Sequence, residues 1–395
     1  MLSSCMGGRV VNLVQSLHIP DHIRFECSGC GNCCLEWPVP ATTEDVARIE
    51  SLTTDAPFRA LKSGDQKFRG FSHTLEKRED GRCHFLTENN RCRLHEEHGC
   101  DAKPAMCRLF PHAFSFTPSG IYVYVSFASS GVLSNHGRLL NEQRELLEQR
   151  LKLYEQLFPT TRPDWSKLQL LDGHALPWDD FLRIDKQLLD VFDSPEFDST
   201  EHRLLECSRV IAACLPPGAD PESMPPVEAS PATIDHIILK HLFNAYLPAD
   251  VFSHSEFDID ARALMTDIVQ PKPEQMDFEK LQQVTLGRLD EDTEQLIHRF
   301  AYARLFAKLY LGPNFAYLSL LSGIHHFYFV VALIRLRIKQ LQLDGHKVDF
   351  LEAAEVVRTI ERRLSQMNFS PQSSAVMEVL FSSPARPTRL QALIR

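Results

Sequence analysis

Eight of the chain's eleven cysteines fall between residues 25 and 111, and their spacing suits metal ligation. Four of them stand in the run Cys27-Ser-Gly-Cys30-Gly-Asn-Cys33-Cys34. Thiolates two residues apart can bind one metal ion, because the backbone between them bends around the ion. The interleaved glycines permit such bends. The sequence therefore predicts eight metal ligands: Cys27, Cys30, Cys33, Cys34, Cys83, Cys92, Cys100 and Cys107.

The spacing leaves the metal and the number of ions open. Zinc and iron–sulfur clusters both accept ligation by sulfur alone. The cysteines can supply one centre with spare thiols or two four-coordinate ions. Neighbouring side chains rarely point at the same centre, so Cys34 can serve a second ion. Some of the eight can also be thiols that only pack in a core. Histidines that can complete a mixed site are His84, His95, His98 and His112.

The remaining cysteines and histidines give no comparable signal. Cys5, Cys207 and Cys214 are isolated, and we expect them to be core or surface thiols. His325 and His326 lie in an apolar segment, where histidines with satisfied hydrogen bonds in a core are the commoner case. No residue has a partner at a spacing that identifies it as catalytic.

Composition predicts a soluble globular protein. The 395 residues are 44% hydrophobic and 24% charged, and can form two or three domains. The net charge of -10 disfavours nucleic-acid binding. The start of the chain lacks the pattern of a signal peptide, which predicts a cytoplasmic location. Clustered cysteines in that reducing compartment favour metal binding or catalysis over disulfides. The longest apolar run, residues 318–334, predicts a buried helix and no membrane span.

The pattern of hydrophobic residues predicts a mainly α fold. A small cysteine-rich α+β metal-binding domain precedes a helical bundle-like domain. The cysteine-rich part includes a helix capped by Thr43 and a strand at residues 121–127, paired near residues 68–71 or 83–85. The predicted organisation is a lead-in (1–24), the cysteine-rich domain (25–135), a helical segment (136–214), a proline-rich linker or loop (215–232), a helical domain (233–381) and a frayed tail (382–395).

These motifs resemble the CxxCxxCC family of zinc- or iron-chelating proteins. The resemblance rests on Phe25 and the first four cysteines, on Cys83-x-Phe-Leu, and on Pro104-x2-Cys107-Arg-x-Phe-Pro111. The lengthened segment from Leu94 to Lys103, which carries Cys100, is similar to the flagellin lysine-N-methylase branch. Many relatives have a further cysteine shortly after the next strand, where this chain reads Phe-Ala-Ser-Ser at residues 127–130.

The resemblance implies a bound zinc ion or iron–sulfur cluster. It further implies S-adenosylmethionine as a methyl donor and a flagellin-like protein substrate whose lysines are methylated. The chain has neither the glycine-rich strand-to-helix loop of a Rossmann-type donor site nor the CxxxCxxC spacing of radical enzymes. Two alternatives are a non-enzymatic zinc or iron chelator and an interaction module held together by structural zinc.

Overall fold

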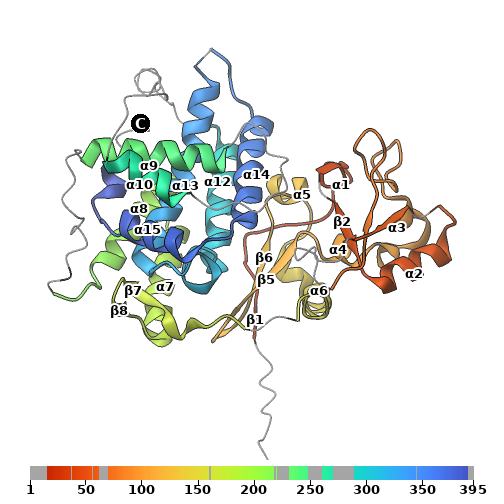
Figure 1. Cartoon of the computed structure of the whole chain (residues 1–395), viewed down its shortest axis with the longest axis horizontal. Coiled ribbons are helices and arrows are strands. Elements are labelled where there is room, and N and C mark those ends of the chain that lie inside the picture. Colours follow the sequence, from red (N-terminus) through yellow and green to blue (C-terminus); the bar gives the residue numbers. More distant parts are fainter. Residues whose placement is uncertain are drawn as a thin grey trace, which may run out of the picture.

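The computed structural model describes residues 16–36, 38–55, 57–61, 70–159, 162–217, 219, 231–247, 260–269, 289–343 and 345–389. Cys5, most of the expected linker at 215–232 and the end of the expected tail lie outside these ranges. Figure 1 shows a large helical lobe, a smaller lobe that carries the cysteines, and a sheet between them. The predicted mainly α fold, with a small cysteine-rich α+β part in front of the helices, is confirmed.

The small lobe has a hydrophobic core of its own, which includes Val39, Ile49, Phe85 and Leu94. Short elements surround this core, and its three-stranded antiparallel sheet has the order β2-β4-β3. The elements are α1 (Cys33–Glu36), β2 (Val39–Ala41), α2 (Thr43–Leu52), β3 (Phe58–Ala60), β4 (His73–Leu75), α3 (Arg93–His98), the 3-10 turn η2 (Cys100–Ala102) and α4 (Ala105–Leu109).

Helix α2 is capped by Thr42, and the prediction of Thr43 as its cap is wrong by one residue. Thr42 Oγ1 accepts a hydrogen bond from the Asp45 N–H at 3.1 Å, and the Asp45 carboxylate accepts one from the Thr42 N–H at 3.2 Å. This reciprocal capping box satisfies two backbone donors. The buried Asp45 carboxylate also accepts the Ala105 N–H at 3.0 Å. It thereby ties α2 to α4, the helix that carries Cys107.

A second sheet lies between the lobes and corrects a predicted strand pairing. Its strands are β1 (Leu17–His18), β5 (His112–Thr117) and β6 (Gly120–Val125), in the order β1-β6-β5. The predicted strand at 121–127 is present as β6, but it pairs with β5 and β1 instead of residues 68–71 or 83–85. The tight turn at residues 118–119 folds β6 back onto β5. A side chain at Gly120 would collide with the Ser16 carbonyl oxygen, so glycine permits the approach of β1.

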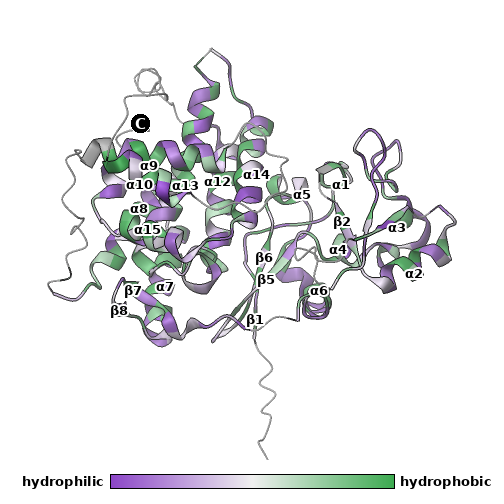
Figure 2. Cartoon of the chain, viewed as in Figure 1, coloured by the Kyte–Doolittle hydropathy of each residue, from purple (hydrophilic) through white to green (hydrophobic). Residues whose placement is uncertain are grey.

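The large lobe is helical, and its longest helix, α13, lies at its centre against α8, α14 and α15. Figure 2 shows hydrophobic and hydrophilic stretches alternating along these helices. Two helices follow the second sheet, α5 (Ser130–Leu133) and α6 (Arg144–Leu157), and α6 packs against β5 and α4. The elements of the large lobe are β7 (Gln169–Leu171), β8 (His174–Ala175), α7 (Trp178–Asp193), α8 (Thr200–Ala212), α9 (Pro231–Tyr246), α10 (Ala261–Val269), α12 (Glu291–Phe306), α13 (Leu320–Leu341), α14 (Phe350–Gln366) and α15 (Pro371–Phe381).

Helix α13 is long and apolar enough to cross a membrane, but 94% of its apolar window is buried inside the structure. It is therefore a core helix, as the sequence predicts. Its two histidines have hydrogen-bond partners, also as expected. His325 Nδ1 donates to the Phe381 carbonyl oxygen at 2.6 Å, and His325 Nε2 lies 2.6 Å from Ser208 Oγ. His326 Nε2 lies 2.7 Å from the Tyr246 hydroxyl.

Because these two histidines are buried, we expect the fold to lose stability in acid. Burial lowers the pKa of His325 to about 4 and that of His326 to about 3. The unfolded chain, in which histidine titrates near ~6.5, binds more protons below that pH. Stability is therefore complete above pH ~6.5 and falls as the pH drops toward the folded pKa values, by about 3 kcal/mol for His325 and about 5 kcal/mol for His326.

We expect His326→Gln to flatten this dependence by up to about 1.4 kcal/mol per pH unit between pH ~6 and ~4. Urea unfolding at a series of pH values measures the effect. The exposed His22, replaced by glutamine, is the control that leaves the slope unchanged. An unaltered slope in His326→Gln would contradict the prediction.

The described part of the segment after α15, residues 382–389, is anchored, whereas the sequence predicts a frayed tail. Arg386, 1% exposed, forms an ion pair with the buried Asp235 of α9 at 2.6 Å. Arg389 Nε lies 2.6 Å from the other oxygen of the same carboxylate. The basic residues of this segment are thus used to neutralise a buried acid, so the segment is anchored to the helical lobe.

Candidate metal centre

Four of the eight predicted ligands pack against the core of the small lobe. We call these four the inner cysteines: Cys34, Cys83, Cys92 and Cys107. They come from α1, from the turn after β4, from the residue before α3, and from α4. The Cys83 N–H donates to the Cys34 carbonyl oxygen at 3.0 Å, and an isolated bridge joins Leu86 to Cys92. The fold thus gathers thiols that are far apart in the sequence around one core.

Three of the inner cysteines, Cys34, Cys83 and Cys107, have raised pKa values, which favour the thiol form in the metal-free protein. Burial, followed by the charges of Cys83, Cys33 and Cys92, raises the pKa of Cys34 to about 12. Burial likewise raises the pKa values of Cys83 and Cys107. A thiolate is the form that binds metal, so each ligand must lose a proton on binding. A metal cation would offset the burial, and the smaller repulsion between neighbouring cysteines, that raise these pKa values.

Two lysines that the cysteine spacing does not indicate, Lys77 and Lys103, lie beside the inner cysteines. Lys77 Nζ donates to the Cys34 carbonyl oxygen at 2.6 Å. Burial alone would lower the pKa of Lys103, but the neighbouring Cys107, Cys100 and Cys92 outweigh burial and raise it. Four thiolates around a divalent ion would carry two excess negative charges, which Lys77 and Lys103 would offset. The sequence signal that could have indicated these lysines is the presence of basic residues between the cysteines.

The donor set suits zinc or iron, while the side chains are not yet arranged as a closed site. Four thiols match the sulfur-only ligation that both metals accept. Within the described residues, no three cysteine, histidine, aspartate or glutamate side chains converge closely enough to hold an ion. The inner thiols must therefore turn toward one another for tetrahedral ligation.

Three other predicted ligands, Cys27, Cys30 and Cys33, lie outside that core, and we call them the outer cysteines. Cys27 is exposed, while Cys30 and Cys33 are half-buried. Ser130, which begins α5, hydrogen-bonds Cys30 through its side chain and Cys33 through its backbone. Burial alone would raise the pKa of Cys30, but hydrogen bonds from Ser130 and other neighbours outweigh it, and the pKa is lowered. Burial raises the pKa of Cys33.

Helix α14 of the large lobe completes the surroundings of the outer cysteines. In Figure 1, α14, α5 and α1 follow one another across the junction of the lobes. Arg358 Nη2 donates to Ser130 Oγ at 2.8 Å, and its charge acts on Cys30 and Cys33. Arg362, one turn further along, lies near Cys33. No local signal in the sequence could have linked these arginines to cysteines more than 300 positions earlier.

The eighth predicted ligand, Cys100, does not pack against the small core, but its charge acts on Lys103 together with those of Cys107 and Cys92. An Arg150 guanidinium nitrogen lies 3.7 Å from the Cys100 sulfur. His84 lies 2.9 Å from an Asp55 carboxylate oxygen. Burial lowers the pKa of His112 to about 4, and its Nδ1 donates to the Leu109 carbonyl oxygen at 3.1 Å. His112 Nε2 is buried without a hydrogen-bond partner among the described residues, unlike the ring nitrogen of His84.

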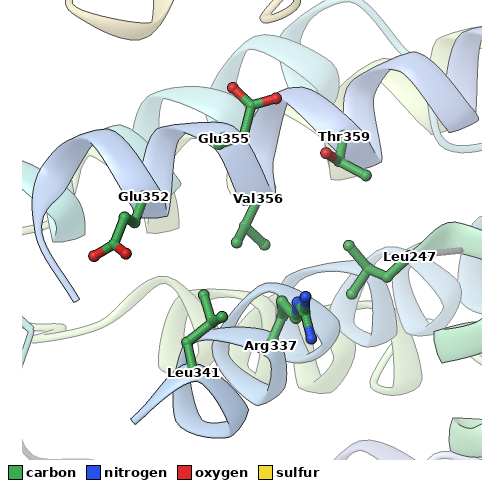
Figure 3. Close-up of a pocket in the computed structure, with 7 residues that line it drawn as sticks. All are labelled: Leu247, Arg337, Leu341, Glu352, Glu355, Val356 and Thr359. Atoms are coloured by element: carbon green, nitrogen blue, oxygen red, sulfur yellow. The ribbon is translucent and has the colours of Figure 1, made fainter. Parts of the chain in front are cut away.

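Helix α14 also lines a surface pocket of about 240 Å³ beside α13 and the end of α9. Figure 3 shows Val356 of α14 pointing toward Leu341 of α13 across this pocket. The Glu355 carboxylate lies 2.9 Å from Arg358 Nη1, the residue that contacts Ser130 beside the outer cysteines. The full lining is Leu247, Arg337, Leu341, Glu352, Glu355, Val356 and Thr359. One helix therefore borders both the cysteines and this pocket.

Comparisons with known proteins agree with this location of the site. Residues 26–131 match the model of the CxxCxxCC family, whose description is "Putative zinc- or iron-chelating domain". The match contains all eight cysteines and supports metal binding. An uncharacterized protein of Methanocaldococcus jannaschii is 26% identical over 195 residues, which cover 47% of this chain and 64% of the relative. The chain thus spans less than two thirds of that relative's length. No solved structure matches the chain.

Proposed function

We propose that this protein chelates zinc or iron through the inner cysteines, Cys34, Cys83, Cys92 and Cys107. The observation that carries the proposal is that these four thiols pack against one small core, within the segment that matches the chelating family. Lys77 and Lys103 supply positive charge beside them. Chelation without catalysis is sufficient to account for this arrangement.

The deciding experiment is metal and acid-labile sulfide analysis of full-length protein purified without oxygen, together with its absorption spectrum. We expect about one zinc or iron centre per chain, because four thiolates complete one tetrahedral ion or one cluster. Iron with sulfide would identify an iron–sulfur cluster, and zinc without sulfide a mononuclear site. Protein that neither retains nor takes up either metal would refute the proposal.

Lysine methylation with S-adenosylmethionine is a more specific prediction, and it rests only on the resemblance to the flagellin lysine-N-methylase branch. The flagellin-like protein substrate is a prediction of the same kind, and the cytoplasmic location is a prediction from the missing signal-peptide pattern. The direct test offers metal-loaded protein labelled S-adenosylmethionine and flagellin, and measures label in lysine. The Cys107→Ser variant is the matched control, since a metal-dependent methylase would lose the transfer. Absence of label with fully loaded protein would leave chelation as the function.

A further inference from the structure

Three arginines meet where the small lobe packs against α6. Arg48 comes from α2, Arg108 from α4 and Arg150 from α6, and α4 packs against α6. The charges of Arg48 and Arg150 both act on Arg108, so the three guanidinium groups lie close together. The side chains of Arg48 and Arg108 are only 31% and 19% exposed, and Arg150 is half-buried. Like charges that are partly shielded from water repel one another more strongly than exposed ones.

Two carboxylates of the described residues act on Arg108, and they do not balance the three arginines. Asp45 pairs with Arg48 at 2.6 Å, and its oxygens also accept two backbone N–H groups. Asp101 Oδ1 lies 3.8 Å from Arg108 Nη1, beyond hydrogen-bond distance, and its side chain is 92% exposed. Such an exposed pair contributes little. Three guanidinium charges against two carboxylate charges leave one positive charge in excess.

Arg108 and Arg150 also have unused hydrogen-bond donors. A guanidinium group carries five N–H donors. Among the described residues, the hydrogen-bond partner of Arg150 is the Cys100 sulfur, 3.7 Å from Nη2, and Arg108 has none. The Nε atoms of both arginines are buried without a partner, and so is Nε of Arg48. Because buried donors in folded proteins are nearly always paired, these atoms indicate an acceptor that the chain itself does not supply.

We propose that Arg48, Arg108 and Arg150 form a binding site for a phosphate group. Arginine binds phosphate through two parallel N–H···O bonds, and the several oxygens of phosphate can accept from more than one guanidinium group. A phosphate between Arg108 and Arg150 supplies both the missing negative charge and the missing acceptors. Arg48 is already paired with Asp45 and contributes mainly its position at the edge of the site. The site requires no thiolate and no metal, so it is independent of the proposed chelation.

A phosphate group at this site would join three helices, because each arginine comes from a different one. It would hold α2 and α4 of the small lobe against α6. The unfolded chain has no equivalent site, since the three arginines are far apart in the sequence. A ligand that binds only the folded chain stabilises it, and the stabilisation grows with ligand concentration. Phosphate should therefore raise the unfolding temperature of the protein.

The test measures thermal unfolding and calorimetric binding of the full-length protein with inorganic phosphate, at an ionic strength held constant with chloride. Phosphate also stabilises proteins in general, so the informative quantity is the difference between variants. We expect Arg150→Gln to weaken phosphate binding about tenfold or more, because it removes charge-assisted hydrogen bonds. The same variant should lose most of the phosphate-dependent rise in unfolding temperature. Arg183→Gln, on an exposed arginine of α7, is the matched control and keeps the full rise.

A second probe, phenyl phosphate, distinguishes two sources of the phosphate group. Tighter binding of phenyl phosphate than of inorganic phosphate identifies a phosphate group carried by a larger molecule, and the reverse identifies the free ion. If Arg150→Gln does not fold, Arg108→Gln takes its place, and broadening of the phosphorus NMR signal of phosphate by the unmodified protein measures binding without any variant. Two results overturn the site: the unmodified protein binds neither probe, or phosphate raises the unfolding temperature of the variant as much as that of the unmodified protein.

Discussion

Replacing Cys107 with serine is expected to remove the bound metal, from about one ion or cluster per chain to almost none. Cys107 packs against the small core beside Cys34, Cys83 and Cys92, and a serine hydroxyl stays protonated where a thiol can ionise. Metal analysis of the purified protein after dialysis against a weak chelator measures the loss.

The control for this substitution is Cys214→Ser, because Cys214 is exposed at the end of α8 and far in sequence from the cysteine segment. Circular dichroism checks that the helical lobe is intact in both variants. Cys92→Ser provides a second test if the Cys107 variant does not fold. Full metal content in both Cys107→Ser and Cys92→Ser would exclude the inner cysteines as the ligands.

The second large effect is expected from Glu361 of α14, which joins the central sheet to the helical lobe. Its carboxylate accepts hydrogen bonds from the Tyr124 hydroxyl at 2.8 Å, Ser126 Oγ at 2.9 Å and Arg304 Nη1 at 2.9 Å. Glu361 is 2% exposed and Arg304 is 6% exposed. Glu361→Ala would leave a buried arginine uncompensated, which typically costs about 3–5 kcal/mol.

Urea unfolding of the metal-free proteins measures this loss. Glu148→Ala removes an exposed glutamate that also pairs with an arginine, and should change the free energy of unfolding by less than about 1 kcal/mol. The double variant Glu361→Leu/Arg304→Met removes both charges and should be more stable than Glu361→Ala. Equal stability of Glu361→Ala and Glu148→Ala would show that the buried network contributes little.

The sequence predicts the helices of the large lobe where hydrophobic periodicity is strong, including α7, α8, α9, α13 and α14. It predicts the first and last residues of these helices less well than their presence. The hydrophobic pattern predicts a helix over 289–311, whereas α12 ends at Phe306, because Lys308 adopts a positive φ of 58°. The hydrophobic pattern does not predict α15, although Ser370 and Pro371 form a helix-start signal. It does not predict α10 either, because the short length of that helix limits any periodic signal.

The same contrast applies to the candidate site. Features set by nearby residues could be predicted, and features set by distant contacts could not. Clustering of cysteines could be predicted, because the signal is their spacing. Their separation into inner and outer groups could not, because it depends on contacts such as that of Arg358 with Ser130, which are 228 residues apart. The assignment of Cys27, Cys30, Cys33 and Cys100 as direct ligands stays a prediction.

The chain order of these contacts also sets an order of assembly on the ribosome. The core of the small lobe uses residues 39–102, and the last inner cysteine follows at Cys107. The surroundings of Cys30 and Cys33 need Arg358 and Arg362, which are synthesised near the end of the chain. N-terminal units fold first during synthesis. A nascent chain therefore completes its inner thiol cluster well before α14 emerges, whereas the surroundings of Cys30 and Cys33 are complete only when the chain is finished.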